Sequence, residues 1–206
     1  MAVLELAADE RRDLLGLLRS LDDSDWDAPT LCEGWAVRDV VAHIVSYEGV
    51  GPVGLVKRFA QGRMWLSKIN QVSLSPLRDA PPAVLINAVE ANLRPSGLTA
   101  GFGGRIALTD GLVHQQDIRR PLGVDRQIPS QRLREALDFA RFAPPIRGAW
   151  NIRGVRLVAP ELDWSFGVGP EAVGTGEAVL MALAGRAGVA RELTGPGAQR
   201  LQNRLG

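Results

Sequence analysis

The sequence has few of the residues that usually form disulfides or metal sites. Only one of its 206 residues is cysteine, Cys32, which excludes an internal disulfide framework and a zinc site made of several cysteines. There are two histidines, His43 and His114. Any site that uses imidazole therefore involves one or both of these residues.

Long apolar runs and an excess of one charge are also missing. No uninterrupted apolar segment approaches the ~20 residues that a membrane span needs, and the first ten residues lack the basic region of a signal peptide. The formal net charge is +1, from 24 basic and 23 acidic residues, and the pairs at 11–12 and 119–120 are isolated. We therefore expect a cytoplasmic protein that binds neither nucleic acid nor a membrane.

Helical periodicity dominates the first two thirds of the chain. Its hydrophobic content of 46% and charged content of 23% are typical of a globular protein. Apolar residues at helical spacing predict four long helices, at residues 3–21, at 35–49, from Pro81-Pro82 to Arg94, and at 105–120, the last stopped by Pro121 and Gly123. Between the second and third, we expect a break at 51–54, a helix at 55–66 and a connector at 70–78.

The pattern changes in the last third. After a helix at 130–142 and an Ala-Pro-Pro linker, residues 155–159 and 163–168 alternate like two strands joined by a turn. A glycine-rich turn at 167–176, a helix at 177–185, a short helical piece near 190 and another at 198–205 follow. The sequence thus predicts a mainly α protein, with a helical bundle at 1–142 and a small α/β domain at 143–206.

The most informative stretch is the fourth predicted helix. Asp110, His114 and Asp117 share one face of it, because residues three and four apart are neighbours on a helix. Ile106 and Val113 flank them, so the face is not a simple solvated stripe. Carboxylates and an imidazole among apolar residues are costly unless they are paired or ligate an ion.

His43 lies at the edge of the apolar face of the second predicted helix, and it suggests what the polar face binds. With Asp110 and His114 it can supply three ligands to a divalent ion from two helices of a bundle. Asp117 would then accept a hydrogen bond from the other nitrogen of His114. Alternatively, Asp117 is the ligand and Asp110 the outer partner, or the group is a structural Asp–His network without metal.

Other familiar catalytic patterns have less support. Nothing near Cys32 in the sequence activates its thiol, so we expect it to pack under Trp35. Gly-Val-Gly-Pro at 167–170 lacks the frame and the lysine of a phosphate-binding loop. No Gly-x-Ser-x-Gly element supports serine hydrolase chemistry.

Two motifs and the tail resemble a known family. Residues 29–43 (PTLCEGWAVRDVVAH) and 112–123 (LVHQQDIRRPLG) resemble signatures of the mycothiol-dependent maleylpyruvate isomerase family, of the DinB-like metal-dependent superfamily. Short stretches at 163–164, 167–171, 183–186 and 193–197 resemble its small carboxy-terminal domain. The similarity spans nearly the whole chain.

The resemblance implies a DinB-like four-helix bundle and a set of metal ligands. The family's ligand positions fall on His43, Asp110 and His114, and the ion is typically zinc. The isomerase carries glutamate where Asp110 stands, and aspartate is one methylene shorter. Either the helices lie closer together, or Asp110 reaches the metal through water, or the site is degenerate.

The resemblance also implies a reaction class. Metal-bound mycothiol, a small thiol cosubstrate, would act as thiolate in a transferase or isomerase of a small electrophilic substrate, with Arg119, Arg120 and Arg153 as candidates for binding its carboxylates. The alternatives are a non-catalytic module that binds a small ligand and a thiol-independent metal hydrolase. The sequence leaves open the acceptor substrate, the metal, and whether the protein is a monomer or a homodimer.

Overall fold

The computed structural model describes residues 2–48, 77, 79–143 and 146–205. These divide into two compact units, Met1–Asp125 and Arg126–Gly206. The expected break at 51–54 and helix at 55–66, with most of the connector at 70–78, lie outside the described residues. None of the helices in the described part of the chain has the length and apolar character needed to cross a membrane.

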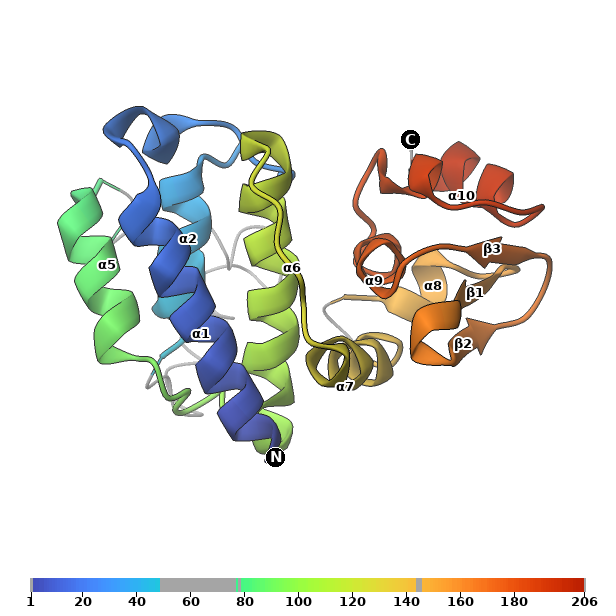
Figure 1. The fold of residues 1–206 in the computed structure, drawn as a ribbon, viewed down its shortest axis with the longest axis horizontal. Coiled ribbons are helices and arrows are strands. Elements are labelled where there is room, and N and C mark those ends of the chain that lie inside the picture. The colour runs from blue at the N-terminus through green and yellow to red at the C-terminus, as the bar shows by residue number, and fades with distance from the viewer. Residues whose placement is uncertain (1, 49–76, 78, 144–145, 206) are drawn as a thin grey trace, which may run out of the picture. The chain divides into compact units, whose positions relative to one another are not determined.

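In the described residues of the first unit, four helices pack as a bundle (Figure 1), as the sequence predicts. They are α1 (Val3–Ser20), α2 (Val37–Ser46), α5 (Pro82–Ala91) and α6 (Arg105–Leu122). Helices α1 and α2 each pack against both α5 and α6. Two 3-10 turns, η1 (Asp23–Asp27) and η2 (Gly101–Gly104), lie in the connections.

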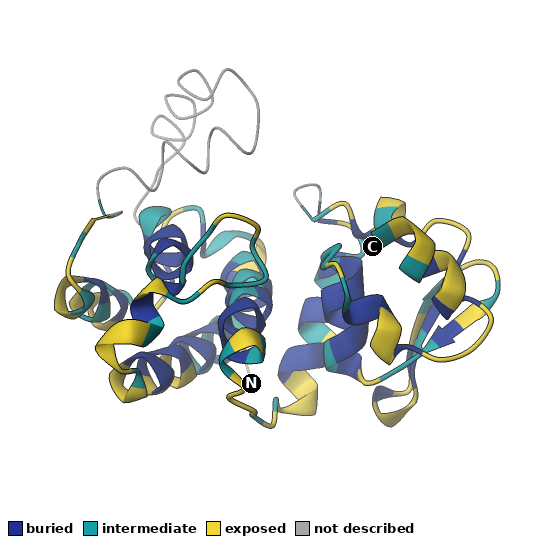
Figure 2. Cartoon of the chain, turned by 90° about the horizontal axis from the view of Figure 1, so that it is seen from above, coloured by how far each residue is buried: buried dark blue, intermediate teal, exposed yellow. Residues whose placement is uncertain are grey.

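Buried residues line the inner faces of the bundle (Figure 2). The core joins Leu14 and Leu18 of α1 to Val40 and Ile44 of α2 and Leu85 of α5, all at most 4% exposed. This apolar packing is the main source of the unit's stability, since short isolated helices are marginal in water.

Helix α2 is shorter than its periodicity suggests. It ends at Ser46 rather than near residue 49, and so does not include Glu48. Glu48 lies beyond the helix and forms a buried ion pair with Arg11 of α1. Its carboxylate also accepts hydrogen bonds from Thr99 Oγ1 at 2.7 Å and from the backbone N–H of Ser96 at 3.0 Å.

Helix α6 continues through Pro121, which the sequence predicted would stop it. Proline lacks the N–H that would donate to the carbonyl four residues earlier, on Asp117. In this structure, the backbone N–H of Leu31 donates to that carbonyl instead, at 3.0 Å. The helix ends at Gly123, whose φ of 66° is the left-handed conformation that suits glycine.

The second unit is a small α/β module. Its sheet contains β1 (Arg156–Ala159), β2 (Trp164–Gly167) and β3 (Glu171–Val173) in the order β2-β1-β3. Strand β1 pairs antiparallel with β2, as expected, and parallel with β3. Strand β3 lies in the segment expected to be only a turn, so that expectation was wrong. Only three residues long, it is fixed by pairing with β1 rather than by an apolar pattern of its own.

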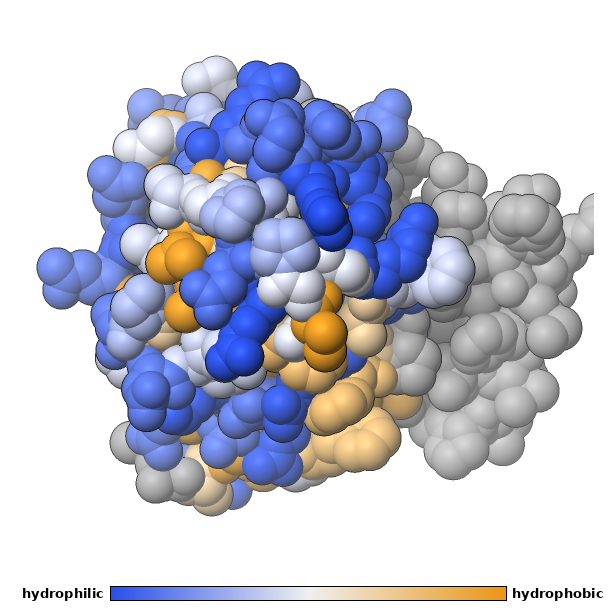
Figure 3. All heavy atoms as spheres, turned by 90° about the vertical axis from the view of Figure 1, so that its right-hand side faces the viewer, coloured by the Kyte–Doolittle hydropathy of each residue, from blue (hydrophilic) through white to orange (hydrophobic). Residues whose placement is uncertain are grey.

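Helices surround this sheet. They are α7 (Ser130–Ala140), α8 (Gly148–Asn151), α9 (Gly176–Leu183) and α10 (Ala198–Leu205), with 3-10 turns η3 (Pro160–Leu162) and η4 (Val189–Glu192). Helix α9 is almost wholly buried and packs against α7 and β1. The face drawn in Figure 3 is mostly hydrophilic, with hydrophobic residues left of its centre and toward its lower right.

Helix α7 belongs to the second unit, whereas the sequence suggested a boundary after residue 142. The Trp164 indole donates to Asp138 Oδ1 of α7 at 3.0 Å, and Arg134 of α7 donates to the Leu162 carbonyl. These contacts tie α7 to the strands, so the compact units divide after Asp125.

Candidate metal centre

Helix α2 presents His43 between two aromatic rings. The helix starts where the Asp39 carboxylate accepts the backbone N–H of Ala36 at 3.0 Å, which satisfies a donor at the helix end. The His43 side chain is 9% exposed. Its ring centroid lies 5.2 Å from that of Trp35 and 5.5 Å from that of Tyr47. The two aromatic residues restrict the orientation of the imidazole.

Helix α6 brings Asp110 and His114 to the same place. The ring centroids of His43 and His114 are 4.8 Å apart. Oδ1 of Asp110 lies 3.7 Å from Nε2 of His43 and 3.5 Å from Nε2 of His114. The structure therefore brings together the three residues that the sequence selected as metal ligands.

These separations suit a tetrahedral ion. With bonds of 2.0–2.2 Å to nitrogen and oxygen, ligand atoms in a tetrahedron are roughly 3.3–3.5 Å apart. The distances from Asp110 Oδ1 to the two imidazole nitrogens are 3.7 and 3.5 Å. Two imidazoles and one carboxylate are also the donor set of several catalytic zinc sites, in which a fourth position is left for water or substrate. The residues present thus fit a divalent ion.

Asp117 occupies the other side of His114. Its Oδ2 lies 2.9 Å from Nδ1 of His114, and its side chain has no solvent exposure. A carboxylate in this position fixes the orientation and tautomer of a histidine ligand. Both α6 carboxylates therefore approach His114, one at each ring nitrogen.

Cys32 is also part of this cluster, contrary to expectation. Its Sγ donates to Oδ2 of Asp117 at 3.1 Å and lies 3.7 Å from Nδ1 of His114. We expected Cys32 only to pack under Trp35, because nothing near it in the sequence activates the thiol; its polar neighbours in the structure are 82 and 85 residues away along the chain. The hydrogen bond from Leu31 to the Asp117 carbonyl holds the Cys32 loop against α6.

The two α6 residues perturb each other's ionisation. Burial disfavours the charged form of each side chain, but the opposite charge of its partner outweighs this effect. The charge and hydrogen bond of His114, with a smaller contribution from His43, lower the pKa of Asp110 well below its ordinary value. The Asp110 charge, with the hydrogen bonds between the His114 ring and Asp110, Asp117 and Cys32, raises the pKa of His114 well above its ordinary value. In the metal-free protein, this pair favours a charged Asp110 carboxylate beside a charged His114 imidazolium.

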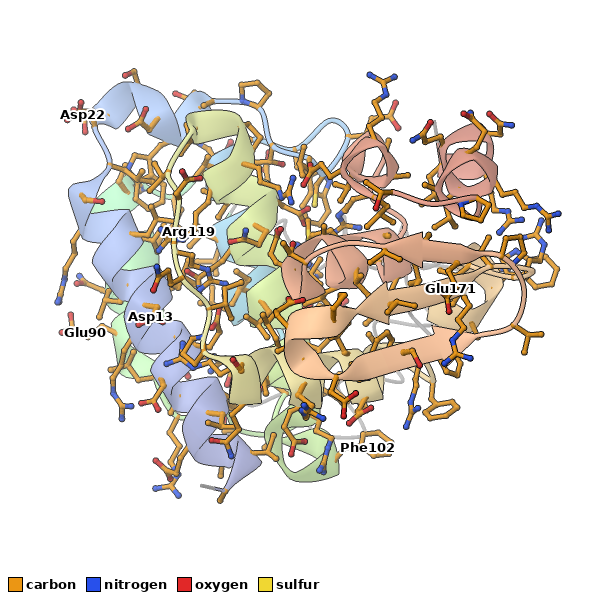
Figure 4. All side chains as sticks on the ribbon, turned by 45° about the vertical axis from the view of Figure 1, so that its right-hand side comes forward. Asp13, Asp22, Glu90, Phe102, Arg119 and Glu171 are labelled. Carbon is orange, nitrogen blue, oxygen red and sulfur yellow. The ribbon has the colours of Figure 1, made fainter. Side chains whose placement is uncertain are left out.

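The three arginine candidates lie outside this donor group. The Arg119 side chain (Figure 4) is buried on another side of α6, where its Nε donates to Gln115 Oε1 at 3.2 Å. Arg120 is half-buried near the end of α6. Arg153 belongs to the second unit, where its guanidinium lies 4.4 Å from the Trp150 ring centroid.

Every histidine, cysteine, aspartate and glutamate of the chain lies in the part that the structure describes. Within the described residues, the groups of three such side chains with donor atoms close together are His43–Asp110–His114 and Cys32–His114–Asp117. They share His114, which makes this residue the centre of the cluster.

Comparisons with known proteins agree with the fold of the chain. Two solved structures resemble the chain: a mycothiol-dependent maleylpyruvate isomerase, at 15% identity and a TM-score of 0.58, and its histidine-to-alanine mutant, at 13% and 0.56. Each alignment covers 94% of this chain and 91% of the other, and at such identities it establishes the common fold. No curated protein is similar enough in sequence to count as a match. Residues 7–93 match the family described as the mycothiol maleylpyruvate isomerase N-terminal domain, which confirms the family resemblance expected from the sequence.

Proposed function

We propose that this protein is a metal-dependent, mycothiol-using isomerase or transferase that acts on a small electrophilic substrate. The observation that supports it best is the position of Asp110 Oδ1, which lies within 3.7 Å of the Nε2 atoms of both His43 and His114. Three donor atoms from two helices thus converge, as catalytic zinc sites require. The proposal favours direct ligation by Asp110 over contact through water.

The reaction follows from the chemistry of thiols. A divalent ion in this site would lower the pKa of a thiol bound to it and make thiolate available at neutral pH. The thiolate sulfur can form a bond to an electrophilic carbon, with a proton transferred to the neighbouring carbon, which gives conjugation. If the neighbouring carbon is not yet protonated, rotation about the former double bond followed by cleavage of the new carbon–sulfur bond releases the thiolate, and the net result is cis–trans isomerisation.

The residues around the donor set have distinct tasks in this proposal. Asp117 accepts the Nδ1 proton of His114, so that Nε2 is free to donate its lone pair. Trp35 and Tyr47 hold the His43 ring and shield that side of the site from water. Such pre-organisation places the thiol before the substrate arrives.

Metal content tests the first part of the proposal. Protein purified without a histidine tag, loaded with zinc and dialysed should retain one ion per chain by mass spectrometry. His43→Ala and His114→Ala should lose it. Glu90→Gln is the matched control, because Glu90 is a half-exposed carboxylate on α5 that pairs with Arg19 away from the site. Retention of zinc by both histidine variants, or no zinc in the wild type, would contradict the metal site.

Thiol dependence tests the second part. We expect turnover of an electrophilic cis-alkene acid only when both metal and mycothiol are present, and maleylpyruvate is the first compound to try because the similar solved structures carry its name. Turnover of a substrate by the metal-loaded protein without thiol would instead indicate a hydrolase. Binding of small ligands without any turnover would indicate a non-catalytic module.

A further inference from the structure

We propose that Cys32, Asp117 and Nδ1 of His114 form a second metal position, selective for soft, thiophilic cations, which excludes occupancy of the His43–Asp110–His114 position. This inference concerns the same cluster as the proposed function, but it does not depend on mycothiol chemistry.

The three donor atoms already lie close to the arrangement that an ion requires. Cys32 Sγ is 3.1 Å from Asp117 Oδ2 and 3.7 Å from His114 Nδ1. Asp117 Oδ2 and His114 Nδ1 are 2.9 Å apart. For bonds of about 2.3 Å to sulfur and about 2.0–2.2 Å to nitrogen and oxygen, tetrahedral ligand atoms are roughly 3.3–3.6 Å apart. Shifts of a few tenths of an ångström would therefore admit an ion.

The position is buried at one end and accessible at the other. The Asp117 side chain has no solvent exposure, and its Oδ2 lies against the Cys32 thiol and Nδ1 of His114, so an ion bound here would replace these two contacts with bonds to the same three atoms. The side chain of His114 is 12% exposed, and Cys32 is half-buried. An ion can therefore reach the cluster from the Cys32 side.

His114 makes the two positions exclude each other. A neutral imidazole has one nitrogen with a free lone pair and one that carries a proton. When Nε2 ligates an ion beside His43 and Asp110, Nδ1 keeps its proton and donates it to Asp117. When Nδ1 ligates an ion beside Cys32 and Asp117, the proton is on Nε2, and Asp110, 3.5 Å away, is its acceptor. The Cys32 thiol releases its proton to solvent as the sulfur–metal bond forms.

The two donor sets differ in the ions they prefer. The His43 set contains nitrogen and oxygen donors only, whereas the Cys32 set adds a thiolate. Zinc accepts both thiolate and imidazole ligands and carboxylate suits harder ions, so an ion softer than zinc gains most from the Cys32 thiolate. The geometry therefore predicts that cadmium selects the Cys32 position and displaces zinc from its neighbour.

A cadmium titration tests this directly, because the chain has a single cysteine and any strong thiolate signal must come from it. Metal-free protein titrated with cadmium should develop sulfur-to-metal absorption in the near ultraviolet that saturates at one ion per chain. His43→Ala should retain this absorption, and Cys32→Ser should lose it. Cys32→Ser should still bind zinc, which shows that this variant is folded.

Several results would overturn the proposal. One is the absence of sulfur-to-cadmium absorption in both the wild type and His43→Ala while the wild type still binds zinc, which would leave the proposed metal enzyme intact. Another is absorption in Cys32→Ser. Zinc and cadmium bound together in excess of one ion per chain would refute mutual exclusion, and a cadmium-dependent dimer on size exclusion would show that the sulfur ligand is shared between chains.

Discussion

Nδ1 of His114 lies 2.9 Å from Oδ2 of Asp117, a carboxylate with no solvent exposure. We expect Asp117→Ala to lower zinc affinity by about 10–100-fold, because partners of a ligating histidine fix its tautomer and orientation. Competition with a chromophoric chelator measures this change. Asp117→Asn, which keeps one acceptor oxygen, should lose less. Equal affinities for the wild type and Asp117→Ala would contradict the assigned role.

The paired ionisation of Asp110 and His114 predicts how stability depends on pH in the metal-free protein. Because the pKa of His114 is raised in the folded protein, protonated His114 stabilises the fold at pH values below about 6.5, the ordinary pKa of histidine. This stabilisation is lost as the pH rises through the raised pKa. Because the pKa of Asp110 is lowered in the folded protein, ionised Asp110 stabilises the fold at pH values above about 3.9, the ordinary pKa of aspartate. This stabilisation is lost as the pH falls below that value toward the lowered pKa.

Stability of the metal-free protein should therefore be greatest between about pH 4 and 6.5 and should decline above that window. Urea unfolding at a series of pH values measures this, with His114→Gln as the comparison. That variant should show a smaller decline at high pH. A decline of equal size in both proteins would assign the pH dependence to other groups.

Gly16 and Gly111 both lie inside helices, but they differ in the space available for a side chain. Gly16 on the exposed side of α1 has open space where a Cβ would be, whereas a Cβ at Gly111 of α6 would lie 3.1 Å from Cγ of Glu10. Glu10 is 1% exposed and accepts a hydrogen bond from Gln115, so it has little freedom to move. Gly16→Ala should stabilise the protein by about 0.5–1 kcal/mol, the usual gain within a helix.

For Gly111→Ala, the same gain is opposed by the close contact, and we expect a net loss of stability. Denaturant unfolding of both variants measures the difference. A stabilisation of Gly111→Ala equal to that of Gly16→Ala would mean that Glu10 moves without cost.

The buried ion pair of Arg11 and Glu48 gives a larger effect. Both side chains are 5% exposed, so Glu48→Ala leaves an uncompensated charge in the interior. Breaking a buried pair in this way typically costs about 3–5 kcal/mol. The double variant Arg11→Met with Glu48→Leu should recover much of this loss. If Glu48→Ala unfolds at the same urea concentration as the wild type, the pair contributes nothing.

The sequence predicted those parts of the fold that have local signals. Repeated apolar spacing and a proline at the helix start were sufficient for α1, α5 and α6. Strand β3 was missed, because its three residues pair with β1, about 15 positions earlier, and have no clear pattern of their own. Helix α7 was assigned to the bundle, because nothing local in the sequence indicates its contact with Trp164.

In the candidate site, too, the residues with local sequence signals were predicted and the one without was missed. Asp110, His114 and Asp117 follow from spacing along one helix, and His43 from its unusual place on a second helix. The part played by Cys32 depends on contacts that span 82 and 85 residues and that no periodicity encodes. Its one sequence signal was its position within the motif at 29–43 that also ends in His43.

Pro121 has a consequence that reaches beyond the end of its own helix. Any other residue at this position would restore an N–H donor, and that donor would compete with Leu31 for the carbonyl of Asp117. Because the intrahelical hydrogen bond is missing, the Asp117 carbonyl can accept the backbone N–H of Leu31, 86 residues earlier in the chain. Pro121, which has the sequence signature of a helix terminator, thus leaves the Asp117 carbonyl free to bind Leu31, and this contact keeps Cys32 Sγ near His114.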